Sequence, residues 1–108
     1  MAKYMLIESR DPFESSDVAQ FCELASGLAS AGNEVTVFLV QNGVLPARFG
    51  ARADGLARLA ESGVRILADA FSLRERAIPT DRLAAGVTPA SIDAVIDAMA
   101  DGAKTIWH

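Results

Sequence analysis

Apolar and polar positions follow two different spacings along the chain. Short, nearly continuous apolar runs occur at residues 4–7, 34–40, 64–68 and 104–107, and each run is typical of a buried strand. Between them, apolar residues recur every three or four positions, as on one face of a helix. This alternation predicts an α/β fold: a three-layer α/β/α sandwich around a mainly parallel sheet of four or five strands, flavodoxin-like in style.

The first two predicted helices separate the first three strands. One spans about residues 16–31, with Ser16 or Asp17 as its cap and Gly32 as its left-handed stop. The other spans about residues 52–62 and is followed by a glycine stop at Gly63. Its inward-facing positions are expected to be Leu56, Leu59 and Ala60.

The second half of the chain predicts more helix and a short extra strand. We expect a short helix over residues 70–77, one helical turn over residues 80–86, and a very short fourth strand at Val87. Thr88 is a good cap for the last helix, and Pro89 suits its first position. The buried stripe of this helix is predicted to be Ile92, Val95, Ile96 and Met99.

Composition narrows the class of protein. The 108 residues suffice for a single domain over residues 1–108, and 51% of them are hydrophobic. The net charge of −4 lacks the basic excess of a nucleic-acid platform, and no apolar run is long enough to span a bilayer. The N-terminal residues lack the features of a signal peptide, and the single cysteine cannot form an internal disulfide. We expect a reduced, cytoplasmic protein without a cofactor.

Several kinds of chemistry are disfavoured by the residues themselves. No glycine-rich phosphate-binding motif follows the first strand, and no nucleophile-elbow motif is present. The only histidine is His108, so a histidine relay or a histidine-based metal site is not expected. Cys22 lies in the middle of the apolar stripe of the first helix, where core packing with a raised thiol pKa is the simpler interpretation. The acidic residues Asp93, Asp97 and Asp101 are expected to face water.

The candidate site lies where the predicted strands end, because parallel sheets bind ligands beyond the carboxyl ends of their strands. The ligand-binding candidates there are Ser9, Arg10, Asn42, Gly43, Phe71, Ser72 and Arg76, with a turn expected at Asn42-Gly43. The arginines of these segments, counted with the neighbouring loops, are Arg10, Arg48, Arg52, Arg74, Arg76 and Arg82. Converging arginines could hold phosphate, sulfate or a carboxylate, which makes an anion-binding module one hypothesis. Alternatively, these arginines simply face water.

Asp69 follows the third predicted strand and allows more than one interpretation. An aspartate before a helix satisfies the free amides of the first turn, so Asp69 can be a helix cap. A carboxylate at a sheet edge can also act as a general base, with Arg10, Ser9 or Asn42 positioning a substrate. Nothing in the sequence names such a substrate.

The order and spacing of several segments resemble a known family. They are residues 9–44 (SRDPFESSDVAQFCELASGLASAGNEVTVFLVQNGV), Gly63-Val64-x-Ile66, residues 73–78 (LRERAI), Gly86-Val87, and the apolar C-terminal strand. Together they resemble the DsrE/DsrF/DsrH and TusB/TusC/TusD sulfur-relay family, also called YchN-like. The resemblance implies a DsrE-like domain of the fold described above.

The resemblance also gives Asp69 a third interpretation. Members that carry sulfur place a cysteine just after the third strand, several residues before an Arg-Gly-Ile/Val segment, which reads Arg76-Ala77-Ile78 here. By this count Asp69 occupies the position of the carrier cysteine, and a carboxylate cannot form a persulfide.

The family resemblance therefore implies a DsrE-like oligomeric protein that is not itself a persulfide carrier. As partners it implies a homo-oligomer (dimer, trimer or hexamer) or other sulfur-relay subunits. The apolar residues expected at the interface are Phe13, Phe49, Phe71 and Trp107.

Overall fold

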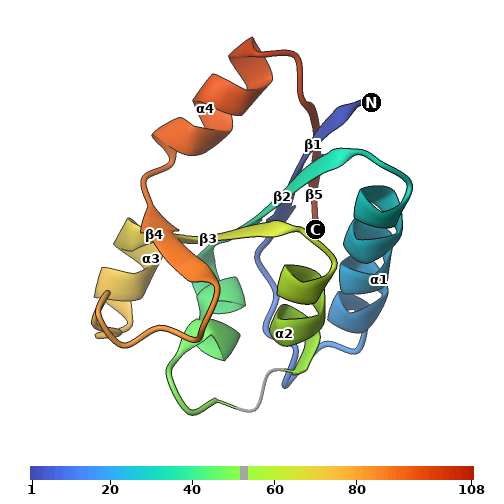
Figure 1. The fold of residues 1–108 in the computed structure, drawn as a ribbon. Helices are drawn as coiled ribbons and strands as arrows, with labels where there is room; N and C mark the ends of the chain where they lie inside the picture. The colour runs from blue at the N-terminus through green and yellow to red at the C-terminus, as the bar shows by residue number, and fades with distance from the viewer. Residues whose placement is uncertain (52–53) are drawn as a thin grey trace.

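The computed structural model describes residues 1–51 and 54–108, and in this part of the chain five strands form one parallel sheet (Figure 1). The strand order is β4-β3-β2-β1-β5. The strands are β1 (Lys3–Glu8), β2 (Glu34–Leu39), β3 (Arg65–Asp69), β4 (Val87–Ala90) and β5 (Lys104–Trp107). Each neighbouring pair is parallel, so the carboxyl ends of all the strands point to one edge of the sheet.

Helices cover both faces of the sheet, which confirms the predicted α/β fold class. The helices are α1 (Asp17–Ser30), the 3₁₀ helix η1 (Gln41–Ala47), α2 (Asp54–Glu61), α3 (Ala70–Glu75) and α4 (Asp93–Ala100). Helices α1 and α2 lie on one face, and α4 lies on the other (Figure 1). The buried residues form two clusters accordingly, one under α1 and α2 and one under α4.

The period-two pattern of the strands explains these two clusters. In β1, Leu6 packs toward α1 and α2, whereas Met5 and Ile7 pack toward α4. In β2, Val37 and Phe38 divide between the two faces in the same way. Both faces of the central strands are therefore buried, as their continuous apolar runs predicted.

Two glycine stops are confirmed, while some helix starts differ from the prediction. Gly32 and Gly63 have φ angles of 92° and 87°, which glycine adopts without strain. Ser16 occupies the cap position of α1, but its side chain makes no capping hydrogen bond. The helix expected from residue 52 is observed from Asp54, and Arg52 lies outside the described residues.

The segment between α3 and α4 contradicts the predicted order of elements. Residues 80–86 form turns rather than a helical turn, because their backbone pairs with the chain after η1. The amide of Ala84 donates to the carbonyl of Ala47 at 2.8 Å, and the amide of Phe49 donates to the carbonyl of Arg82 at 2.9 Å. The chain between α3 and β4 is therefore anchored to the segment that follows η1.

The predicted start of the last helix is also wrong. Thr88 and Pro89 belong to β4 and not to a helix cap, and α4 begins only at Asp93. Pro89 is tolerated because β4 is an edge strand, where one side of the backbone needs no ladder partner. The same proline suits a helix start and an edge strand, which is why the local pattern was ambiguous.

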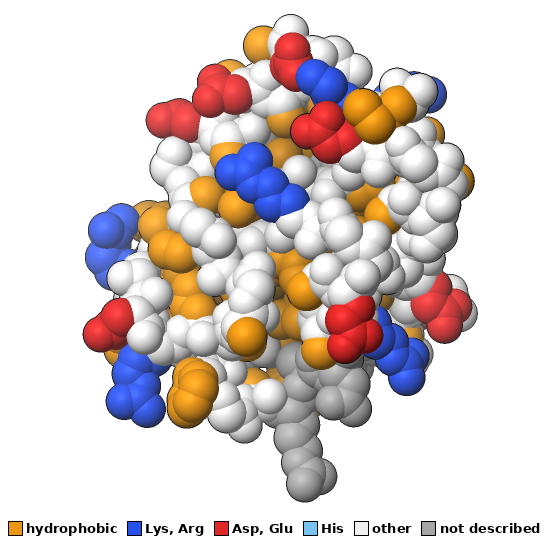
Figure 2. Space-filling view, viewed as in Figure 1, with side chains coloured by type: hydrophobic (Ala, Val, Ile, Leu, Met, Phe, Trp, Pro, Cys, Tyr) orange, Lys and Arg blue, Asp and Glu red, His pale blue; other side chains and the backbone are white. Residues whose placement is uncertain are grey.

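Several side chains predicted to be buried are exposed. Val95 is buried, but Ile92, Ile96 and Met99 are 49%, 58% and 57% exposed. Within the described chain, α4 contacts the sheet cluster through Val95 and the small residues Ala94 and Ala98, so its larger apolar residues face outward. Ala60 of α2 is likewise exposed. Figure 2 shows apolar side chains reaching the surface at several places on one face of the molecule.

Candidate functional site

An open groove lies at the carboxyl edge of the sheet, beyond the ends of β2 and β3. It has a volume of about 1130 Å³. Five of the predicted site residues line it: Asn42, Asp69, Phe71, Ser72 and Arg76. The other lining residues that matter here are Gln41, Arg74, Ser91, Ile92 and Trp107. The sheet edge thus brings together residues from four separate segments of the chain.

Asp69 is a buried residue of the groove lining, at the junction of β3 and α3. It ends β3 and caps α3, and its carboxylate oxygen Oδ2 accepts from the Ser72 amide at 3.0 Å and from the Ser72 hydroxyl at 2.6 Å. Asp69 and Ser72 are 8% and 4% exposed, so these hydrogen bonds are shielded from water. The arrangement is that of a helix cap, one of the roles the sequence allowed.

The same serine connects two strand ends. The Ser72 hydroxyl oxygen accepts from the backbone amide of Gln41 at 2.8 Å. Gln41 has a φ of 52°, an uncommon conformation for a residue with a side chain. Ser72 thus satisfies the amide of a strained residue while it donates to Asp69, and one chain of hydrogen bonds fixes both strand-to-helix junctions.

Arg76 and Asn42 are also bound to each other. Nε and Nη2 of Arg76 donate to Oδ1 of Asn42 at 3.1 and 3.0 Å, and Nη1 donates to the Ser72 carbonyl at 3.2 Å. The next residue, Ala77, has a φ of 54°, which favours glycine. In the Arg-Gly-Ile/Val segment of the resemblance this position is a glycine, which adopts a positive φ without strain. Alanine at position 77 adopts it with strain.

The structure does not bring Ser9, Arg10 and Gly43 into the lining of the groove. The Ser9 hydroxyl donates to the His108 carbonyl at 2.9 Å and accepts from the indole of Trp107, which lines the groove, at 3.3 Å. Arg10 pairs with Asp17 at 3.3 Å. At Gly43 an added Cβ would overlap the backbone carbonyl of Glu8, so close packing requires glycine there.

The arginines do not converge on one point. Arg74 lies over the Phe71 ring at 5.9 Å, and Arg82 lies over the Phe49 ring at 5.7 Å. Arg48 donates to the Leu45 carbonyl at 2.8 Å. Of the arginines that the structure describes, Arg74 and Arg76 line the groove, while Arg52 lies outside the described residues.

Sequence reasoning missed a buried carboxylate–imidazole pair. Nδ1 of His108 lies 2.9 and 2.8 Å from the two carboxylate oxygens of Glu8, which is 2% exposed. The His108 ring stacks on Phe21 with centroids 4.9 Å apart. Burial raises the pKa of the Glu8 carboxyl, although hydrogen bonding to His108 opposes the shift. Glu8 shares a strand face with the buried Leu6, and this alternation was the available signal.

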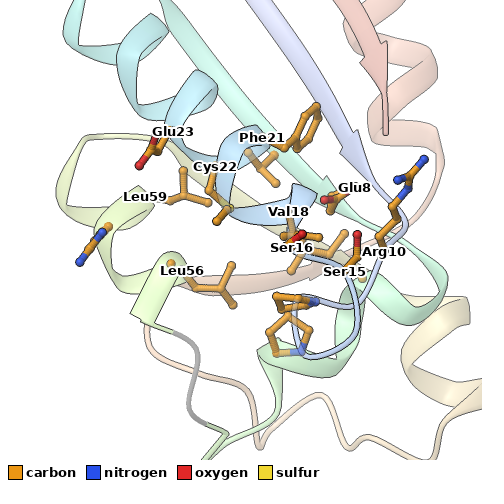
Figure 3. A pocket seen from close by; sticks show the side chains of 18 of the residues that line it. Glu8, Arg10, Ser15, Ser16, Val18, Phe21, Cys22, Glu23, Leu56 and Leu59 are labelled. Atoms are coloured by element: carbon orange, nitrogen blue, oxygen red, sulfur yellow. The ribbon is translucent and has the colours of Figure 1, made fainter.

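Cys22 lies away from the groove. It is half-buried in α1 against the core, and burial raises the pKa of its thiol to about 11. It lines a separate cavity of about 370 Å³ between α1, α2 and the end of β1 (Figure 3). Residues 1–51 and 54–108 contain no group of three or more His, Cys, Asp or Glu side chains placed to hold a metal ion.

These features define a class of protein: parallel α/β domains with a candidate binding groove at the carboxyl edge of the sheet. Within the described residues, no helix is long and apolar enough to cross a membrane. The chain belongs to the DsrE/DsrF-like family, whose sequence pattern matches residues 2–107. Among curated proteins, none matches the chain.

Solved structures share the fold over nearly the whole chain. The ychN protein from E. coli is 18% identical with a TM-score of 0.89, and both chains are covered fully. MTH1491 from Methanobacterium thermoautotrophicum, described as a protein of unknown function, is 20% identical with a TM-score of 0.85 and the same full coverage. BT1422 from Bacteroides thetaiotaomicron is 15% identical with a TM-score of 0.75, covering 96% of this chain and 94% of its own. At these identities the likeness shows the fold alone.

Proposed function

We propose that this chain is an oligomeric DsrE-like protein, related to sulfur-relay subunits, that does not itself carry sulfur as a persulfide. The observation that carries the proposal is the state of Asp69 at the junction of β3 and α3. Its carboxylate is buried and accepts two hydrogen bonds from Ser72. A carboxylate lacks the polarizable sulfur that accepts and releases a sulfur atom. At the position assigned to the carrier by the family resemblance, the chain thus has a helix cap.

The single thiol offers no substitute. Cys22 lies on α1, outside the groove, and the raised pKa of its thiol keeps it protonated near neutral pH. A protonated, half-buried thiol attacks a sulfur donor slowly because the thiolate is the nucleophile. This supports a role in which the chain contributes scaffold and binding surface.

Self-association is part of the proposal. Five exposed large apolar side chains lie on α4 and β5 or border them: Ile92, Ile96, Met99, Ile106 and Trp107. Ile92 and Trp107 also line the groove, so a partner that covers this apolar surface would border the groove as well. Phe71, one of the interface residues expected from the sequence, lies in the same groove and is 59% exposed.

Intact-mass measurement after incubation with a persulfide donor tests the central part of the proposal. The native protein is expected to gain no stable sulfur atom. Cys22→Ser is likewise expected to show no increase in mass after incubation with the donor. A stable added sulfur on the native chain that disappears in Cys22→Ser would overturn the proposal.

An anion-binding module is the second candidate, and the placement of Arg74 and Arg76 in one groove favours it. Thermal shift against phosphate, sulfate and thiosulfate tests this role. A site with a Kd near ~10 μM and tenfold excess ligand stabilises the fold by about 1.4 kcal/mol. Replacement of Arg76 by Gln should abolish that shift, and no response to any of the three anions would remove the candidate.

A further inference from the structure

The cavity between α1 and α2 lies on the other side of the protein from α4 and contains a buried carboxylate at one end. Its volume of about 370 Å³ is at the lower end of the range of ligand pockets, which hold about 300–1,000 Å³. The apolar residues around it include Val18, Phe21, Val37, Leu39, Leu56 and Leu59. Figure 3 shows Glu8 from β1 and Cys22 from α1 around the same space as Leu56 and Leu59 from α2. The cavity can therefore enclose a small, mainly apolar molecule.

Glu8 gives this cavity its chemical preference. Among the side chains that the structure describes, His108 is the one that hydrogen-bonds to Glu8, and Nδ1 of its ring contacts both carboxylate oxygens. Burial raises the pKa of the Glu8 carboxyl, and the hydrogen bonds from His108 and from the backbone of Arg10 and Ser9 oppose that shift only in part, so the carboxylate is not fully compensated for the hydration that it loses. A positively charged group beside Glu8 would supply the missing compensation.

The other charged groups around the cavity do not reverse this preference. Arg10 is paired with Asp17 at 3.3 Å, and the remaining lining charges are Glu23 and Arg58, one of each sign. Among the charged lining residues, Glu8 is the buried one. The electrostatic preference inside the cavity is thus set by a single carboxylate.

We propose that the cavity between α1 and α2 binds a small apolar molecule with a protonated amine, which donates to the Glu8 carboxylate. The apolar body of the ligand packs between Leu56, Leu59 and Val18. His108 acts as a positioning residue, since its hydrogen bonds and its stacking on Phe21 hold Glu8 at the end of the cavity. This inference is independent of the role of Asp69, because Asp69 lines the other groove.

Two probes of similar size and opposite charge test the proposal. Titration calorimetry at pH 8 compares 2-phenylethylamine with 3-phenylpropionate on the full chain. The amine is expected to bind with a Kd below about 1 mM, and the carboxylate at least about tenfold more weakly, because charge-assisted hydrogen bonds are the strong ones. Equal affinity of the two probes, or no binding of the amine, would overturn the proposal.

Cys22 provides a second readout inside the same cavity. The amine should slow the reaction of the Cys22 thiol with methyl methanethiosulfonate in proportion to the fraction of cavities that the amine fills. The thiol lines the cavity, so a bound amine keeps the reagent away from it. Saturating amine that leaves the reaction rate of Cys22 unchanged would place the probe elsewhere and contradict the proposed site.

Two pairs of variants separate the site from general effects on folding. Glu8→Gln should weaken the amine about tenfold or more, whereas Glu61→Gln removes an exposed acid outside the lining and should change nothing. Ala19→Phe places a ring at the exposed rim of the cavity and should block binding, whereas Ala57→Phe at an exposed position of α2 outside the lining should not. If Glu8→Gln does not fold, the pair Ala19→Phe and Ala57→Phe decides, and equal amine affinity in both would overturn the proposal.

Discussion

Replacing Asp69 with alanine removes the side chain that ends β3 and caps α3. Two donors of Ser72, its amide and its hydroxyl, lose their common acceptor at 3.0 and 2.6 Å. Ser72 is 4% exposed, so water cannot readily take the place of the carboxylate. The substitution therefore leaves buried donors unsatisfied rather than exchanging one hydrogen bond for another.

The magnitude follows from these contacts. A buried donor without a partner costs about 1–3 kcal/mol, and loss of a helix cap typically costs about 1 kcal/mol. The Ser72 hydroxyl can rotate while its oxygen still accepts from Gln41, so the two costs do not add in full. We expect Asp69→Ala to lower the free energy of unfolding by about 3 kcal/mol, which for a domain of this size lowers the Tm by about 12 °C.

Urea unfolding followed by circular dichroism measures this difference. Asp69→Asn keeps an acceptor oxygen at the same position and is expected to cost about 1 kcal/mol or less. Asp97→Ala, at an exposed position of α4, is the control and should change the free energy of unfolding by less than about 0.5 kcal/mol. An Asp69→Ala protein as stable as Asp97→Ala would refute the view that Asp69 is a structural cap.

Three further predictions concern other parts of the molecule. Ala77→Gly should raise the free energy of unfolding by about 0.5–1 kcal/mol in urea titrations because φ is 54° there, whereas Ala57→Gly inside α2 should lower it by about 1 kcal/mol. The pKa of Glu8 in the folded state is raised above 4.5, so the fold favours the protonated carboxyl. The contribution of this group to the free energy of unfolding is therefore full below pH 4.5 and is lost as the pH rises through the raised pKa. The free energy of unfolding of the native chain relative to Glu8→Gln should therefore fall as the pH rises above 4.5, and a difference that does not change with pH would contradict the raised pKa of the buried carboxyl. Ile96→Asp should shift the proposed oligomer toward monomer in light scattering, and a mass equal to that of the native chain would exclude the α4 surface as the interface.

The sheet was largely predictable because its signals are local. The apolar run of residues 34–40 and the glycine stop at Gly32 each report a neighbouring element, and both agree with the structure. Pro89 was misinterpreted because its restricted backbone suits a helix start and an edge strand equally well. The buried stripe expected on α4 was wrong at Ile92, Ile96 and Met99, because the spacing of apolar residues marks an apolar helix face but does not show what packs against it.

The site was predictable only in part, because its contacts join distant segments. The end of β3 could be placed from the strand pattern, so the cap at Asp69 was among the expected roles. The bond from Gln41 to Ser72 and the pair of Glu8 with His108 depend on strand order, which spacing alone does not give. Residues 8 and 108 meet because β5 lies beside β1.

The most direct test of the central claim compares the native chain with Asp69→Cys in one experiment. Both proteins are incubated with the same persulfide donor, and the mass of each is measured together with the peptide that carries any added sulfur. The account predicts no stable sulfur on the native chain and a persulfide on residue 69 of Asp69→Cys, provided that circular dichroism shows both proteins folded. A persulfide formed on the native chain would contradict the account.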